Sequence, residues 1–151
     1  MTNNLIIKFT KIFFYKKYNF FRRLRLIFNI DQKINIYKLS LILPPGHLLS
    51  IYNYLYPKYD QFISKLVTKI DYNKSVIDIG ANIGDTLFRL YQNNPKLRYY
   101  SIEADEYFFN YLKKNKKELS KNSQSNITLI KELVGLDLSG NLTKTNTGTK
   151  T

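Results

Sequence analysis

The sequence predicts an α/β fold with a parallel sheet, and three observations in the second half of the chain support this. From Ser75 onward, short apolar strands alternate with amphipathic helices, which is typical of strand–helix–strand units with right-handed crossovers. The first strand runs directly into a glycine turn, VIDIGANIGDT, at residues 76–86. Asp78 and Glu103 fall at the ends of the first two strands, where parallel sheets bind ligands.

Composition limits the available chemistry. The length of 151 residues suits one domain. Without cysteine the chain has no disulfides, zinc thiolates or thiol nucleophiles, and its one histidine cannot build a histidine metal cluster. We expect a reducing, cytoplasmic setting. The formal net charge of +13 suggests anionic partners, but no DNA- or RNA-binding fingerprint accompanies it, so specific nucleic-acid binding is not expected.

Residues 1–33 form a basic N-terminal segment with amphipathic character. No apolar run approaches the roughly 18 residues that a spanning helix needs, and the pattern of a secretory signal is missing. Because cations interrupt the apolar face, we favour a helix packed on its own domain or on a partner. The alternative is a weak peripheral contact of residues 5–28 with an anionic bilayer. The predicted apolar face comprises Leu5, Phe9, Ile12, Phe13, Phe20, Leu24 and Ile27; Lys8, Lys11, Arg22 and Arg25 lie opposite, and Lys16, Lys17 and Arg23 interrupt the pattern.

Residues 34–74 are expected to form a lead-in layer ahead of the sheet. Alternating apolar residues predict a strand over Ile34–Leu43, which a Pro-Pro-Gly turn ends. The spacing is then helical from His47 to Ile70, in two pieces broken at Pro57. The expected buried side comprises Leu48, Ile51, Leu55, Phe62, Ile63, Leu66 and Val67.

Residues 75–140 contain the predicted sheet, and residues 141–151 form a polar tail without an apolar period. A polar linker, SKNSQSN, precedes the last predicted strand. Strands are expected over 75–80, 98–103 and 127–135, and helices over 85–93 and 106–119.

The glycine turn predicts a nucleoside site. Gly80 and Gly84 bracket a turn whose backbone can approach a ligand closely because glycine has no Cβ. The following helix directs free N–H groups and its positive dipole end at the turn, which favours a carboxylate or phosphate there. Glu103, 23 residues after Gly80, can accept hydrogen bonds from both hydroxyls of a ribose. We therefore expect an adenosine-like ligand with a charged tail.

The spacing within the turn narrows the choice of ligand. A dinucleotide fingerprint reads G-x-G-x-x-G, whereas here the glycines are four apart and Asn82, which tolerates a left-handed backbone, lies between them. The frame D-x-G-x-[GN]-x-G over 78–84 resembles motif I of class I S-adenosylmethionine-dependent methyltransferases. VIDIGANIGDT together with YYSIEADEYFFNYLKKN resembles the paired signature of FkbM-type methyltransferases. LILPPGHLLSIY and LYPKYDQFISKLV are similar to the segment ahead of motif I, so the resemblance covers about residues 34–140.

This resemblance implies a Rossmann-like sheet, S-adenosylmethionine as cofactor, and methyl transfer to an oxygen of a small molecule, such as a sugar or secondary metabolite, or of a glycan. The turn would hold the methionine moiety, with the two aspartates near its amino group or a bound water. The glutamate would hold the ribose, and the alanine after it would line the adenine side. The implied cofactor residues are Asp78, Gly80, Ala81, Asn82, Gly84, Asp85, Glu103 and Ala104, with Glu132 or Leu133 as a further candidate beside the adenine.

Several of these acids have simpler interpretations. Asp105 and Glu106 are expected to cap the next helix, and Asp85 could be a first-turn acid of the same kind. His47 is expected to cap or pack rather than to act as a base, and no catalytic residue is predicted. A non-catalytic nucleotide-binding or membrane-peripheral module is the alternative function, ahead of a nicotinamide oxidoreductase.

In the resembling family, GLDLSGNLTKTNTGT would be the turn and edge of a further strand. We therefore expect a sheet truncated after its third or fourth core strand. Such a sheet would leave an edge and apolar surface uncovered.

Overall fold

A computed structural model describes residues 2–36, 39–58, 61–119 and 126–135, with the backbone alone at 2–11, 36 and 39. The predicted tail at 141–151, residues 136–140 and most of the predicted linker lie outside the described residues. The elements in chain order are α1 (Thr2–Phe28), β1 (Gln32–Ile36), β2 (Leu39–Leu43), α2 (Leu49–Leu55), α3 (Gln61–Val67), β3 (Ser75–Ile79), α4 (Asp85–Asn93), β4 (Arg98–Ile102), α5 (Glu106–Leu119) and β5 (Ile127–Ile130).

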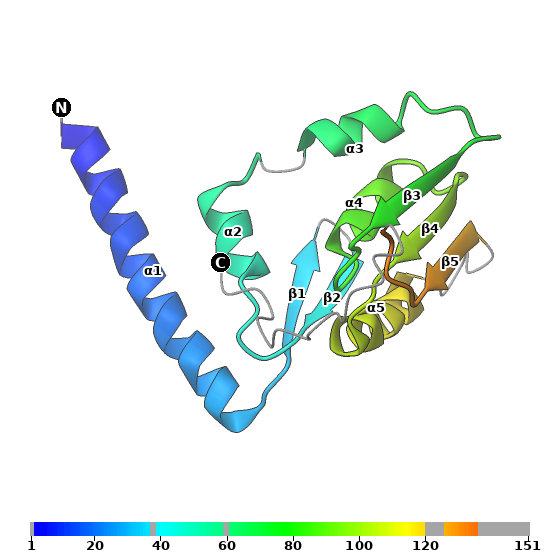
Figure 1. Cartoon of the computed structure of the whole chain (residues 1–151). Helices are drawn as coiled ribbons and strands as arrows, with labels where there is room; N and C mark the ends of the chain where they lie inside the picture. The colour runs from blue at the N-terminus through cyan, green and yellow to red at the C-terminus, as the bar shows by residue number, and fades with distance from the viewer. Residues whose placement is uncertain (1, 37–38, 59–60, 120–125, 136–151) are drawn as a thin grey trace.

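The second half of the described chain is the predicted α/β unit. Strands β3, β4 and β5 form a three-stranded sheet in that order, and both pairings are parallel. Helices α4 and α5 connect successive strands, as expected from the alternating pattern (Figure 1). The last strand is shorter than predicted, because β5 ends at Ile130 rather than at residue 135.

The predicted single strand over Ile34–Leu43 is wrong. The structure has an antiparallel hairpin instead, in which Ile34 pairs with Leu41 and Gln32 pairs with Leu43. The apolar alternation continues through both strands, and no glycine, proline or asparagine stands at positions 37–38 to signal a reversal of the chain. Periodicity therefore identified the extended conformation correctly but could not locate the turn.

The two helices of the lead-in lie on either side of the expected break at Pro57. Of their predicted buried residues, Ile51 and Val67 are buried and Leu48 and Leu55 are half-buried. The prediction is wrong for the other three, Phe62, Ile63 and Leu66, which are exposed. The reason is that α3 is short and packs against α4 through a narrow stripe, with Ser64 and Val67 one turn apart as its buried residues.

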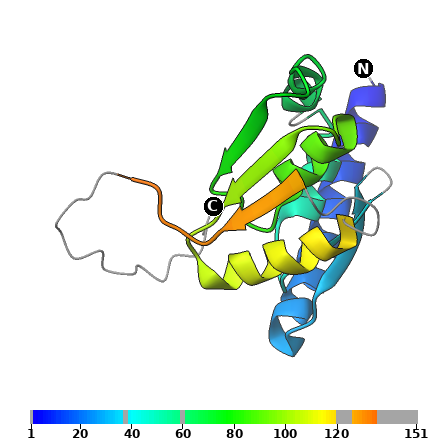
Figure 2. The ribbon, with the colours of Figure 1, turned by 90° about the vertical axis from the view of Figure 1, so that its right-hand side faces the viewer.

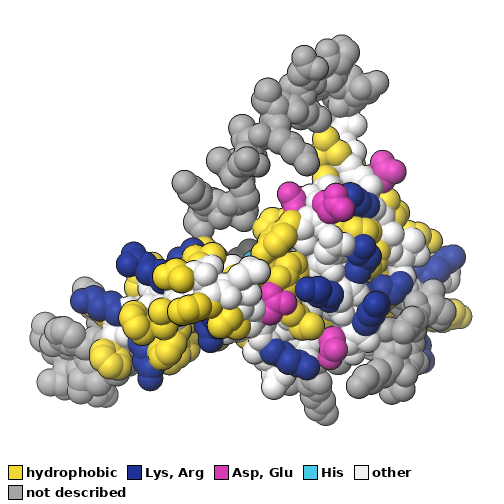
Figure 3. All heavy atoms as spheres, turned by 90° about the horizontal axis from the view of Figure 1, so that it is seen from below, with side chains coloured by type: hydrophobic (Ala, Val, Ile, Leu, Met, Phe, Trp, Pro, Cys, Tyr) yellow, Lys and Arg dark blue, Asp and Glu magenta, His cyan; other side chains and the backbone are white. Residues whose placement is uncertain are grey.

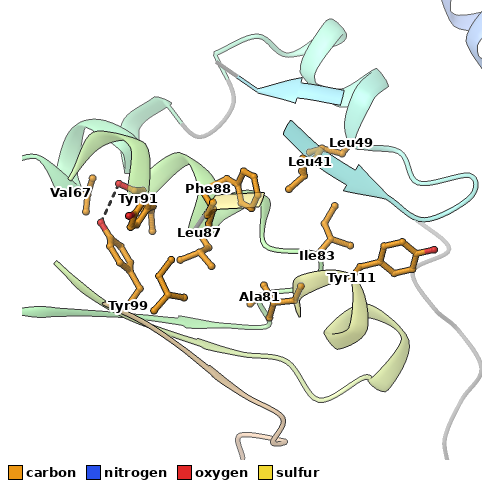
Figure 4. Packing of buried hydrophobic residues seen from close by; sticks show 14 of the residues in the cluster. Leu41, Leu49, Val67, Ala81, Ile83, Leu87, Phe88, Tyr91, Tyr99 and Tyr111 are labelled. Atoms are coloured by element: carbon orange, nitrogen blue, oxygen red, sulfur yellow. Dashed lines mark hydrogen bonds between the residues drawn. The ribbon is translucent and has the colours of Figure 1, made fainter. Parts of the chain in front are cut away.

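The hydrophobic core lies between the sheet, helices α4 and α5, and the hairpin. Figure 4 shows Phe88 and Leu87 of α4 between Tyr99 of the sheet and Leu41 of the hairpin. The core also includes Ala81 and Ile83 of the glycine turn, so apolar packing holds the turn against the rest of the domain. The buried cluster comprises Leu41, Leu43, Leu49, Val67, Ala81, Ile83, Leu87, Phe88, Leu90, Tyr91, Leu97, Tyr99, Tyr111, Leu112, Leu119 and Ile127.

The opposite face of the sheet is open in the described part of the chain. On the face that packs into the core, Tyr99 and Ser101 of β4 are fully buried or nearly so. On the other face, Ile77 and Ile79 of β3 are 64% and 62% exposed. Figure 2 shows the three strands with no described helix over this face. The expected uncovered apolar surface is therefore present among the described residues.

Asn115 of α5 joins three parts of the fold. Its side-chain oxygen accepts a hydrogen bond from the Ile42 N–H at 2.7 Å, and its amide nitrogen donates to the Ile42 and Ile83 carbonyls, both at 2.9 Å. The amide thus satisfies the free edge of β2 as a neighbouring strand would, and it also binds the glycine turn. The Asn115 side chain is completely buried, so water cannot replace these partners.

We expect Asn115→Ala to lower the free energy of unfolding by about 2–4 kcal/mol, because it leaves buried backbone groups without partners. Urea denaturation measures the effect. Asn110→Ala is the matched control, since Asn110 lies on the same helix and is exposed. Equal midpoints for the two variants would show that the amide does not tie these elements together.

Candidate functional site

The glycine turn lies where β3 and β4 end. The backbone is left-handed at three positions, with φ of 77° at Gly80, 50° at Asn82 and 92° at Gly84. The N–H groups of Gly80 and Ala81 both donate to the Ile102 carbonyl at 2.9 Å, and Gly84 N–H donates to the Ala81 carbonyl at 2.8 Å. These bonds anchor the turn to the carboxyl end of the neighbouring strand, which is the ligand-binding edge of a parallel sheet.

Glycine is favoured at positions 80 and 84 for two different physical reasons. A Cβ on Gly84 would lie 2.6 Å from Cδ1 of Leu112, a fully buried side chain, so this glycine lets α5 pack closely. A Cβ on Gly80 would meet no atom within 4 Å, so only its positive φ favours glycine within the described chain. The open space beside Gly80 is therefore where a ligand can approach the backbone.

Glu103 connects the turn to the loop after β4. Its Oε2 accepts a hydrogen bond from the Asn82 N–H at 2.7 Å, and its Oε1 accepts one from the Asp105 N–H at 2.8 Å. Each carboxylate oxygen can accept a further bond, so hydroxyl groups can still bind here. The sequence predicted Glu103 as the acceptor for ribose hydroxyls, which stays a prediction, and its hydrogen bond to the turn was not predicted.

Asp78 carries the most perturbed carboxyl group of the site. Its Oδ2 is buried and has no hydrogen-bond partner among the described residues. Burial, followed by the charges of Asp85 and then Glu103, together raise the pKa of Asp78 to about 6. Three predicted site acids therefore act on one another around the turn. Their mutual repulsion would be relieved by a bound cation.

His47 reaches the turn from the lead-in, which the sequence did not reveal. Its Nδ1 accepts a hydrogen bond from the Leu49 N–H at 3.2 Å, so it caps the start of α2 as expected. Burial lowers the pKa of His47 below its ordinary value, although a hydrogen bond with the Asn82 side chain raises it. The imidazole is therefore neutral at pH 7 and contacts the turn. No local spacing could indicate a contact across 35 positions.

The remaining predicted residues lie at the same edge of the sheet. Asp105 accepts hydrogen bonds from Tyr107 N–H at 2.8 Å and Phe108 N–H at 3.2 Å, which confirms it as the cap of α5. Asp85 is the first residue of α4, and Ala104 is exposed beside Glu103.

Two further acids that the sequence singled out, Glu106 and Glu132, lie in the first turn of α5 and after β5. Glu106 pairs with Lys131 at 3.1 Å on the surface. Glu132 and Leu133 follow β5 and are exposed, and their role beside an adenine stays a prediction. Across the described ranges, no three His, Asp or Glu side chains lie close enough together to hold a metal ion.

Comparisons with known proteins give matches among solved structures alone: no protein-family model and no curated protein matches the chain. TYW2 of M. jannaschii, solved in complex with AdoMet, has a TM-score of 0.46 and 18% identity, covering 68% of this chain and 43% of that one. A SAM-dependent methyltransferase from Agrobacterium tumefaciens has a TM-score of 0.47 and 11% identity, covering 68% and 32%. This chain thus spans less than half of either, and at these scores the likeness establishes no function.

The different reasons for the two glycines can be separated by stability measurements. We expect Gly80→Ala to cost about 1–2 kcal/mol, because only the left-handed backbone opposes the new methyl group. Gly84→Ala should cost about 1–3 kcal/mol more, since its methyl group also meets Leu112 in the core. Urea denaturation of both variants tests this, and equal costs would contradict the packing role of Gly84.

The perturbed carboxyl group predicts a pH-dependent stability. Between about pH 4 and 6 the folded chain holds a proton on Asp78 that the unfolded chain has released, so the free energy of unfolding falls as pH rises through this window. We expect Asp78→Asn to remove this slope and to stabilise the chain at pH 7. The gain should be on the order of 1–2 kcal/mol, discounted for the partial exposure of the carboxyl group.

Denaturation across that pH range measures the slope. Asp71→Asn, which changes an exposed carboxylate just before β3, is the control and should keep the wild-type slope. If Asp78→Asn also keeps it, the carboxyl group is not perturbed as described.

Proposed function

We propose that the glycine turn and its acids bind S-adenosylmethionine. The observation that carries this proposal is the group of mutually repelling carboxylates around a left-handed turn, with one buried oxygen of Asp78 that has no partner in the described ranges. A ligand with a positive charge near the turn would relieve that repulsion. The open space beside Gly80 gives the ligand access to the backbone.

Charge favours this cofactor over a nicotinamide dinucleotide. S-adenosylmethionine carries two cationic groups, a sulfonium and an ammonium, and one carboxylate that the start of α4 would favour, whereas a dinucleotide would bring a doubly negative pyrophosphate to the same turn. Asp78, Asp85 and Glu103 would attract the former and repel the latter. The glycine spacing supports the same choice, since it departs from the dinucleotide fingerprint.

Each residue of the site has a place in this proposal. The ammonium group would lie near Asp78 and Asp85, and the methionine moiety would lie along Gly80, Ala81, Asn82 and Gly84. Glu103 would accept the ribose hydroxyls with its remaining lone pairs, held in position by two backbone N–H groups. Ala104 would face the adenine.

The reaction we propose is methyl transfer to an oxygen acceptor, in an enzyme of FkbM type. The bound cofactor would supply an activated methyl group, so the chain must chiefly orient the two reactants and exclude water. The hydrogen bond from the Asn82 N–H to Glu103 fixes the turn, and the turn would in this way orient the bound cofactor. The FkbM assignment, the sugar, glycan or secondary-metabolite acceptor and the cytoplasmic setting rest on the sequence alone. A nucleotide-binding module without transferase activity has the same binding site.

Calorimetric titration tests the cofactor. We expect heat with S-adenosylmethionine and none with NAD, and binding should strengthen as pH rises through about 6, because ionised Asp78 attracts the ammonium group. Glu103→Gln should weaken binding by about 1.5–3 kcal/mol, since it removes a charged acceptor. Glu106→Gln, an exposed acid three positions on, should bind like the wild type. Absence of heat with S-adenosylmethionine at millimolar concentration would refute the proposal.

A further inference from the structure

Helix α1 is attached to the rest of the chain through the face opposite to the one expected. Tyr18 donates to the His47 carbonyl at 2.8 Å, and Arg22 Nε donates to the Gly46 carbonyl at 2.7 Å. The ring of Phe14 stacks on Tyr54 of α2 with centroids 4.0 Å apart. These three residues are spaced by four and therefore lie on one side of the helix. The attached face thus carries a hydroxyl and a guanidinium group.

The apolar face of α1 points away from the molecule. Phe13, Phe20 and Ile27 are spaced by seven and form one stripe, and their exposed fractions are 72%, 61% and 73%. On a helical wheel this stripe lies opposite the attached face. Of the two favoured expectations, packing on its own domain therefore holds for α1 only through the opposite face, and packing of the apolar face on a partner stays a prediction. An exposed apolar stripe of large side chains is typical of an interaction surface.

Cations border the stripe on both sides. Lys16 and Arg23 flank it on one side and Lys17 on the other, and all three are exposed. Figure 3 shows yellow and dark-blue side chains next to one another along the arm formed by α1. The helix contains seven Lys and Arg residues and no acid. Long basic side chains in these positions can lie along an apolar surface while their charged ends reach anionic groups.

The charges distinguish between two occupants of this face. If two copies of α1 paired through the stripe, Lys16 and Arg23, three residues after Phe13 and Phe20, would occupy the second core position of each heptad. Like charges would then meet in the seam without an acid to neutralise them. An anionic bilayer instead offers hydrocarbon to the stripe and phosphates to the cations.

We propose that α1 lies in the surface of an anionic lipid bilayer, with Phe13, Phe20 and Ile27 inserted and Lys16, Lys17 and Arg23 at the headgroups. The attached face is opposite, so the rest of the molecule lies on the aqueous side. No helix in the described ranges is long and apolar enough to cross a membrane. This proposal is independent of the cofactor site.

Cosedimentation of the full chain with vesicles tests it, comparing pure phosphatidylcholine with vesicles that also contain phosphatidylserine. We expect retention on the anionic vesicles and little on the neutral ones. Neutralising the three cations (Lys16→Gln, Lys17→Gln, Arg23→Gln) should lower partitioning on the order of 100-fold. Replacing the stripe (Phe13→Ser, Phe20→Ser, Ile27→Ser) should lower it by about tenfold per side chain.

Matched controls change equivalent exposed residues outside α1. Phe62→Ser with Leu66→Ser removes apolar surface from α3, and Lys69→Gln, Lys74→Gln and Lys96→Gln remove three other cations; these should retain most of the binding. Circular dichroism checks that every variant is folded. Equal retention on both vesicle types, or equal losses in the control variants, would overturn the proposal. So would a wild-type dimer that the stripe variant alone converts to monomer, because it would assign the face to a second copy.

Discussion

The completely buried amide of Asn115 is the contact on which the arrangement of the described domain depends. One side chain of α5 satisfies the N–H and carbonyl of Ile42 and also binds the Ile83 carbonyl. The first two bonds close the edge of the hairpin, and the third fixes the turn that ends β3. An asparagine can do this because its amide presents a donor and an acceptor side by side, as a peptide group does. The lead-in and the sheet are therefore one packed unit.

The glycine turn combines rigid support with unfavourable electrostatics. Its backbone is anchored to Ile102, its apolar residues lie in the core, and Glu103 holds the Asn82 N–H. Asp78, in contrast, is partly buried near two other acids, and one of its oxygens has no partner within the described part of the chain. Such a combination is typical of a binding site, where an arrangement that is costly without ligand becomes favourable with it.

The sequence predicted those parts that depend on local pattern. Helices α4 and α5 have the predicted bounds, and the parallel sheet follows from the alternation of strands and helices. Features that depend on distant parts of the chain could not be predicted from local pattern. The hairpin has no turn signal in its sequence, and the exposure of Phe62 depends on which neighbours α3 contacts. The same holds for the contact between His47 and Asn82, since nothing in the spacing of two distant residues shows that they meet. For α1 the amphipathic pattern identified the two faces but not which one is attached.

The loop after β2 contacts both α1 and the glycine turn. Gly46 and His47 offer their carbonyls to Arg22 and Tyr18, while the His47 imidazole meets Asn82. This loop therefore sets the distance from the outward stripe of α1 to the ligand-binding edge of the sheet. On a bilayer, that distance would become a fixed working height above the lipid. For the methyl transfer proposed above, acceptor groups carried by the membrane at that height would be found by diffusion in two dimensions, whereas freely dissolved acceptors would gain no such advantage.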